Sequence, residues 1–355
     1  MAVLFMRVVV PSYAYTMIKI ASLKSLIIPQ NEFLKLQRIS DVRNLINSID
    51  QYYPGLNTAL PDYKPSIIQI EKELYNVYMK IFEKILASSP IQLQKFLRSI
   101  LYRYEIWNLK TLLAGTLAKM DKDAIQNEIL MKPEELLQRT KFMNDLLKQR
   151  EITYIMRILS KSRYAKVIKR GFYYFEQTKE IFLLEALLDK FYVEYLHEES
   201  SEFKGIEKVI FNNYVDTMVQ KYNLMLIFRS YRNNIPKSLL HQLILPSGSI
   251  FTSEIISDFI TSDTRADFIS KLKNVINRND FFRKTQLQKY TIDSELLTHI
   301  LSVLNKNIFQ KLEESDIADI DALTIKRVLS FIFNKENEIY RVLGLFVKAI
   351  YKMKD

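Results

Sequence analysis

A short pattern of aromatic, polar and apolar residues occurs three times at nearly equal intervals, and this repetition limits the folds that the chain can adopt. The copies span residues 104–113, 220–228 and, more loosely, 338–346. They align two sets of equivalent positions, which are Trp107, Tyr222 and Tyr340, and then Asn108, Asn223 and Arg341. Glu105 and Glu338 are further motif residues of the first and third copies. The last set gives intervals of 223 − 108 = 115 and 341 − 223 = 118 residues. Near-equal spacing of a similar motif is typical of tandem structural units.

A second helix recurs ahead of the motif in the first two copies. Glu71 precedes Asn108 by 37 residues and Glu185 precedes Asn223 by 38, each within a stripe of apolar residues three and four apart. The segment Leu26-Ile27-Ile28-Pro29 also has an echo in Leu243-Ile244-Leu245-Pro246. These matches predict three helical units, at residues 1–120, 121–236 and 237–355.

Composition favours an all-α fold. Glycine occurs 6 times in 355 residues, against about 7% in average proteins, and hairpins or phosphate loops need more. Hydrophobic residues make up 48% of the chain, which is enough for substantial cores. Apolar periodicity predicts helices along most of the chain, including one continuous helix over 149–168 and a last helix over 323–352.

The sequence contains no arrangement that indicates catalysis or cofactor binding. There are no cysteines and no glycine-rich phosphate loop, and the three histidines (His197, His241 and His299) have no second ligand one helical turn away. We therefore expect no catalytic, cofactor or metal site and no small-molecule ligand. No run of about 20 apolar residues is present, so any membrane role is expected to be peripheral.

The net charge of +11 allows three partner classes, which are nucleic acid, an anionic membrane surface and an acidic protein. Residues 161–175 form the most basic stretch, with aromatic residues between the cations. That composition suits nucleic acid, because cations neutralise phosphates and rings stack on bases. The simpler interpretation is a connection between helices with solvated cations, and we favour it.

Asn108 and Asn223 lie on helical faces that are otherwise apolar. A buried amide is costly unless it is hydrogen-bonded, so we interpret both as polar anchors repeated in each unit. The alternative is that these positions face a central cavity and meet a partner. Arg341 is too large and too charged for an identical buried position.

The order of these motifs resembles the C subunit of archaeal and bacterial V/A-type rotary ATPases, whose eukaryotic counterpart is the d subunit. The resemblance rests on Leu26–Pro29, on Glu71 with Leu74 and Tyr78, on the run from Glu105 to Lys110, and on the run from Lys335 to Val342. It covers essentially the whole chain. Departures include Ala114 and Val347 where the second copy has Arg229, and Arg341 where asparagine is expected.

The resemblance implies a funnel of three helical subdomains around a pseudo-threefold axis. It implies a non-catalytic rotor subunit of a proton-translocating ATP synthase or ATPase, which couples the central stalk to the membrane proteolipid ring and transmits torque. Such a protein would be peripheral, at the cytoplasmic face of the membrane, without a cofactor, and no nucleic acid partner would be expected. The alternative function is a helical-repeat nucleic-acid-binding protein; an enzyme of unknown class has only the length of the chain in its favour.

Overall fold

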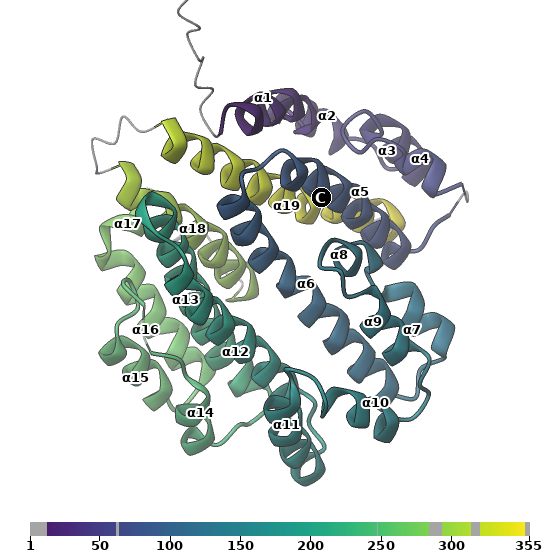
Figure 1. The fold of residues 1–355 in the computed structure, drawn as a ribbon. Helices are drawn as coiled ribbons and strands as arrows, with labels where there is room; N and C mark the ends of the chain where they lie inside the picture. The colour runs from purple at the N-terminus through teal and green to yellow at the C-terminus, as the bar shows by residue number, and fades with distance from the viewer. Residues whose placement is uncertain (1–12, 62–63, 247, 284–292, 314–319, 352–355) are drawn as a thin grey trace, which may run out of the picture. The chain divides into compact units, whose positions relative to one another are not determined.

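The computed structural model describes residues 13–61, 64–246, 248–283, 293–313 and 320–351. Every regular element in these ranges is a helix, which confirms the all-α prediction (Figure 1). None of the helices in the described ranges is both long enough and apolar enough to cross a membrane.

Contacts divide the chain into two compact units. The first contains residues 1–101, 127–138 and 317–355, and the second contains residues 102–126 and 139–316. The division into three units at 1–120, 121–236 and 237–355, and the funnel around a pseudo-threefold axis, stay predictions.

The first unit is built around α5 and α19, which pack against each other. Helix α5 begins at a capping box, in which the Ser66 side chain accepts from the Gln69 N–H and the Gln69 side chain accepts from the Ser66 N–H. Helix α19 also packs against α1 and α3, and the Tyr78 hydroxyl of α5 donates to the Ile332 carbonyl of α19. The helices of this unit are α1 (Ala14–Leu23), η1 (Lys24–Leu26), α2 (Gln30–Leu36), α3 (Val42–Ile49), α4 (Leu56–Ala59), α5 (Ile67–Ala87), the first part of α6 (Ile91–Leu117), α8 (Met131–Leu136) and α19 (Ile320–Tyr351).

The second unit is organised around α13, which packs against α12, α14, α15, α16 and α18. Helix α12 also packs against α11 (Figure 1). The helices of this unit are the rest of α6, most of α7 (Lys122–Glu128), α9 (Thr140–Leu147), α10 (Ile152–Leu159), α11 (Ala165–Thr178), α12 (Phe182–Glu199), η2 (Ser200–Glu202), α13 (Gly205–Arg232), α14 (Lys237–Leu243), α15 (Ser253–Thr261), α16 (Arg265–Arg278), α17 (Asp280–Arg283) and α18 (Asp293–Glu313).

The prediction of a single helix over 149–168 is wrong. The structure has two helices there, α10 and α11, which are separated by a turn. The Ser162 hydroxyl donates to the Leu159 carbonyl, and its oxygen accepts from the Tyr164 N–H at 3.1 Å. A serine side chain that satisfies nearby backbone groups in this way competes with helical hydrogen bonds. The apolar periodicity continues across the break, which is why the sequence pattern did not reveal it.

Gly171 lets α11 approach α12 closely. A Cβ at this position would lie 2.3 Å from Leu184 Cδ1 and 3.2 Å from Leu184 Cα, so an added methyl group would meet the backbone of α12 as well as a side chain. Replacing Gly171 by alanine should therefore push α11 away from α12.

We expect Gly171→Ala to lower the free energy of unfolding by about 1–2 kcal/mol, because overpacking outweighs the gain in helix propensity. The control is Gly344→Ala in α19, where nothing lies within 4 Å of the added Cβ and stability should rise by about 0.5–1 kcal/mol. Urea denaturation measures both, and equal effects of the two changes would contradict close packing at Gly171.

Candidate functional site

The three motif copies share a buried polar residue three positions before the asparagine position. These residues are Glu105, Gln220 and Glu338, and they are 0%, 0% and 5% exposed. A carboxylate or amide buried to this degree needs hydrogen-bond partners, and each of the three has them. In each copy the partners include groups far away in the sequence.

In the third copy, Glu338 joins α19 to the segments that precede and follow α2 and α3. Its Oε2 accepts from the Ile28 N–H at 2.6 Å and its Oε1 accepts from the Tyr53 hydroxyl at 2.9 Å. The Lys335 ammonium donates to the same Oε1 at 2.6 Å. One carboxylate therefore holds two segments that lie 310 and 285 residues away in the sequence.

Lys335 is itself fully buried within this group of contacts. Its ammonium donates to the Leu26 carbonyl at 2.6 Å and to the Tyr52 carbonyl at 3.1 Å, and it lies 3.6 Å from the centre of the Tyr53 ring. Burial lowers the pKa of Lys335 to about 8 even though Glu338 opposes the shift. Burial, and then the Glu338 charge, raise the pKa of Tyr53 well above its usual value.

In the second copy, Asn223 holds the backbone of Leu245. Its Nδ2 donates to the Leu245 carbonyl at 3.1 Å and its Oδ1 accepts from the Leu245 N–H at 3.0 Å. Gln220, one turn earlier, accepts from the Phe251 N–H at 3.3 Å and donates to Asp216 at 2.8 Å. The two similar sequence segments, 26–29 and 243–246, are thus both bonded to a buried polar side chain of a motif helix.

In the first copy, Glu105 accepts hydrogen bonds from the Arg139 guanidinium and the Tyr164 hydroxyl. Burial, and then the Glu105 charge, raise the pKa of Tyr164 well above its usual value. Asn108 is fully buried, and Trp107 is half-buried beside the Tyr104 ring. The buried position three residues before the asparagine position therefore recurs in every copy.

The aromatic positions of the motif differ in environment. Tyr222 is buried and donates to the Leu243 carbonyl at 3.0 Å, whereas Tyr340 is 55% exposed. Arg341 is exposed, donates to Gln30 at 3.0 Å and lies 3.7 Å above the Phe33 ring. The third copy thus presents two of its motif residues to solvent.

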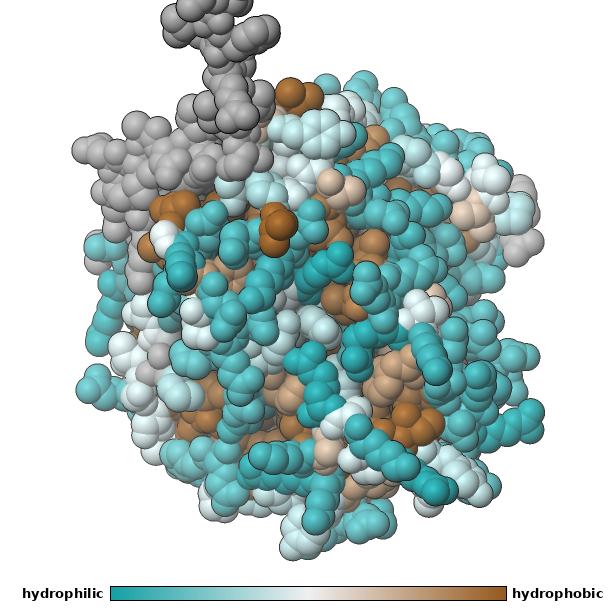
Figure 2. Space-filling model, viewed as in Figure 1, coloured by the Kyte–Doolittle hydropathy of each residue, from teal (hydrophilic) through white to brown (hydrophobic). Residues whose placement is uncertain are grey.

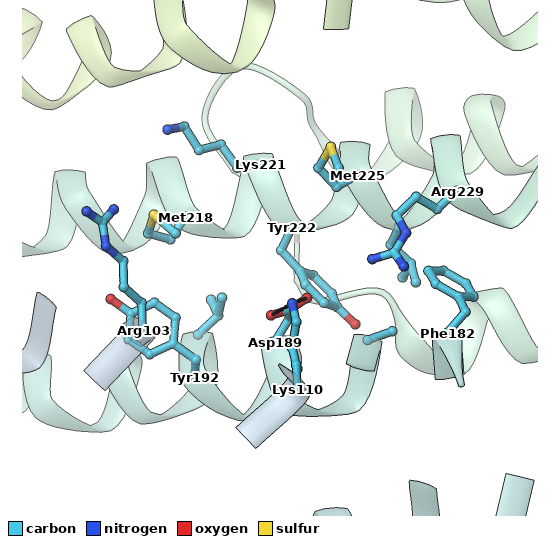
Figure 3. A pocket seen from close by; sticks show the side chains of 13 residues that line it. Arg103, Lys110, Phe182, Asp189, Tyr192, Met218, Lys221, Tyr222, Met225 and Arg229 are labelled. Carbon is cyan, nitrogen blue, oxygen red and sulfur yellow. Dashed lines mark hydrogen bonds and ion pairs between the residues drawn. The ribbon is translucent and has the colours of Figure 1, made fainter. Parts of the chain in front are cut away.

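A cavity of about 270 Å³ lies in the second unit among α6, α12 and α13 (Figure 3). Four cationic side chains and one carboxylate line it, and all of the lining residues belong to the second unit. These charged residues are Arg103 and Lys110 from α6, Asp189 from α12, and Lys221 and Arg229 from α13.

The cations of the cavity are held in place by their neighbours. Lys110 bonds both oxygens of Asp189, at 2.9 and 3.0 Å, and Lys221 donates to the Asn305 side chain at 2.6 Å. Arg229 pairs with Glu185 at 2.6 Å. Four cations against one lining carboxylate leave the cavity with an excess of positive charge.

The rest of the wall is apolar and includes Met218, Met225 and the Phe182 ring. Methionine side chains adapt to the shape of a partner because they are unbranched and flexible. The described residues contain no group of three or more histidine, cysteine, aspartate or glutamate side chains that could hold a metal ion. The cavity suits an acidic group carried on an apolar segment.

Sequence reasoning missed several residues of these sites. Gln220 lies inside a motif copy, and its three-residue offset from Asn223 was the available signal. Lys335 opens the run from Lys335 to Val342 that carries the resemblance, but nothing in that run marks its ammonium as buried. Tyr53 and Tyr164 have no local signal, because their hydroxyls matter only where tertiary packing brings them to a carboxylate.

Asn223→Leu should lower the free energy of unfolding by about 2–4 kcal/mol, because both backbone groups of the buried Leu245 lose their partners. Asn212, which is exposed on the same helix, offers a matched control, and its change to leucine should alter stability by less than about 0.5 kcal/mol. Chemical denaturation compares the two variants. Equal stability of both would show that the Asn223 contacts are not a structural anchor.

Lys335 should make stability depend on pH. Folding lowers its pKa, so the unfolded chain holds the proton more tightly, and stability increases as the pH rises from about 7 to 9. This group should contribute a gain of about 1 kcal/mol over that range, and the gain should be missing in Lys335→Met. Urea titrations of both proteins at several pH values measure it, and parallel pH profiles would contradict the shifted pKa.

Comparison with known proteins gives a match to the ATP synthase (C/AC39) subunit model over residues 19–355. The A-type ATP synthase C subunit of Pyrococcus furiosus is 23% identical over 350 residues, which cover 95% of this chain and 86% of that protein. The Pyrococcus abyssi protein of the same name is 20% identical over 349 residues, with 96% and 86% covered. The Methanobrevibacter smithii protein is 23% identical over 318 residues, with 86% and 76% covered. The resemblance seen in the sequence is confirmed, and the chain belongs to the ATP synthase (C/AC39) subunit family.

Proposed function

We propose that this chain is a non-catalytic coupling subunit of an A-type, proton-translocating ATP synthase, which connects the central stalk to the membrane proteolipid ring and transmits torque. The observation that carries the proposal is the family match over residues 19–355, joined to a cationic cavity walled by two of the motif helices. A nucleic-acid-binding function has no comparable support.

A part that transmits torque has to resist deformation. Close-packed helices do so, because protein interiors have low compressibility. The three motif helices α6, α13 and α19 are 27, 28 and 32 residues long. Lys335 and Glu338 tie segments near the start of the described chain to α19, which lies near its end. These features support a rigid adaptor within each unit.

The cavity of the second unit is our candidate contact for the central stalk. A stalk segment that ends in acidic side chains on an apolar helix would match both the excess cations and the methionine-rich wall. The pairs already present, Lys110–Asp189 and Arg229–Glu185, orient two of the cations toward this space. Such pairs near the surface contribute about 0–1 kcal/mol to stability.

The proposed location is the cytoplasmic face of the membrane, as a peripheral subunit. The contact with the proteolipid ring belongs to the same proposal. Attachment would depend on contacts with the other proteins of the complex and on the membrane surface.

Lys221→Glu tests the cavity, because it reverses one cation without touching the buried anchors. We expect the dissociation constant for the purified central-stalk subunits to rise at least about tenfold, which corresponds to about 1.4 kcal/mol. The matched control is Lys208→Glu, an exposed lysine near the start of the same helix, which should bind like the wild type. Isothermal titration calorimetry at constant ionic strength measures both.

If Lys221→Glu left the dissociation constant for the stalk subunits unchanged, the cavity would not be part of the stalk contact. The broader function has its own test in the assembled complex. A complex without this chain should still hydrolyse ATP but lose ATP-driven proton pumping in vesicles, and retained pumping would overturn the coupling role.

A further inference from the structure

The part of the chain that forms α10 and most of α11 carries charges of one sign only, all of them positive. Residues 152–175 contain no aspartate or glutamate. They carry six cations, and all six are exposed, namely Arg157, Lys161, Arg163, Lys166, Lys169 and Arg170. None of the six forms an ion pair with a carboxylate of the described residues. We call this set the α10–α11 basic face.

The packing of α11 keeps this face outward. Ile168 and Gly171 are its buried residues, and Gly171 lies against Leu184 of α12. Figure 2 shows hydrophilic side chains gathered over this end of the second unit, with small hydrophobic areas beside them. The basic face is therefore a fixed surface of a helix whose other side is anchored.

The aromatic rings that surround Arg163 are engaged within the protein. The Arg163 guanidinium lies over the rings of Tyr102, Phe191 and Tyr195, at 4.7, 5.4 and 4.4 Å. Rings used in this way are poorly placed to stack on unpaired bases, which is what single-stranded nucleic acid would require.

We propose that the α10–α11 basic face binds the headgroups of an anionic lipid surface. Its cations are spread over the last turn of α10, the turn that follows it and α11, a helix about 21 Å long, and do not converge on one point. A spread of charge fits a surface that presents many anions. Tyr154 and Tyr173 are 52% and 58% exposed, and tyrosine is enriched at the depth of the headgroups in membranes.

This inference rests on the proposed function, because a subunit beside the proteolipid ring works next to lipid. The binding itself is a property of the chain alone and can be measured without the complex. Each basic residue near an anionic lipid surface contributes about a fivefold gain in partitioning at physiological ionic strength. Removing three lysines should therefore weaken binding about a hundredfold.

The test uses the full chain and vesicles of phosphatidylcholine with about 30% phosphatidylglycerol, compared with vesicles of pure phosphatidylcholine. The variant combines Lys161→Gln, Lys166→Gln and Lys169→Gln. The control combines Lys24→Gln, Lys80→Gln and Lys84→Gln, which are exposed lysines of the first unit and change the net charge equally. Co-sedimentation at rising salt gives the partition coefficients.

We expect the wild type and the control to bind anionic vesicles in a salt-sensitive manner, with little binding to neutral vesicles, and the α10–α11 variant to lose about a hundredfold. Equal binding by the variant and the control would show that only net charge matters and would overturn the proposal. Tighter binding to a double-stranded RNA than to the anionic vesicles would overturn it in favour of nucleic acid.

The stalk-binding assay separates this inference from the function on which it rests. A variant that loses vesicle binding but keeps its affinity for the stalk subunits supports both. If the wild-type chain binds the stalk subunits but no anionic vesicle, the lipid contact is overturned and the proposed function stands. If the wild-type chain binds anionic vesicles but not the stalk subunits, the proposed function is overturned and the lipid binding of the α10–α11 basic face stands.

Discussion

The structure depends on buried polar side chains of the long motif helices that hold the backbone of distant segments. Glu338 is the clearest case, because one carboxylate accepts from a backbone N–H, a tyrosine hydroxyl and a buried lysine. Burying such a group without partners costs several kcal/mol, so the contact forms only when all partners are in place. That requirement selects one register for the segment against the helix, which apolar packing alone specifies less strictly.

The polar groups of the chain fall into two sets with different roles. Glu105, Gln220 and Glu338 are enclosed and have their hydrogen bonds inside the protein. The six cations of the α10–α11 basic face are exposed and have no carboxylate partner among the described residues, and the cavity among α6, α12 and α13 has more cations than carboxylates. The enclosed set accounts for how the helices are held. The second set is the one to which our proposals assign the contacts with partners.

Much of the fold could be predicted from the sequence, and the exceptions have physical reasons. The helices at Ile67–Ala87 and Phe182–Glu199 follow from their apolar stripes, and the family follows from the order of weak motifs. The break between α10 and α11 was missed because serine hydrogen bonds to nearby backbone interrupt a helix without interrupting its apolar period. The alignment of Tyr340 with Tyr222 holds in sequence only, since one is exposed and the other buried.

By itself the sequence determined the helical class, the repeated motif helices, the family and the concentration of positive charge, because these follow from periodicity, composition and local order along the chain. Only the tertiary structure decided which groups meet. Tyr53 with Glu338, Tyr164 with Glu105, and Lys110 with Asp189 are pairs separated by 59 to 285 residues. No local pattern encodes such pairs, because a hydroxyl or an ammonium acquires its partner, and Lys335 its lowered pKa, from packing that removes water around it.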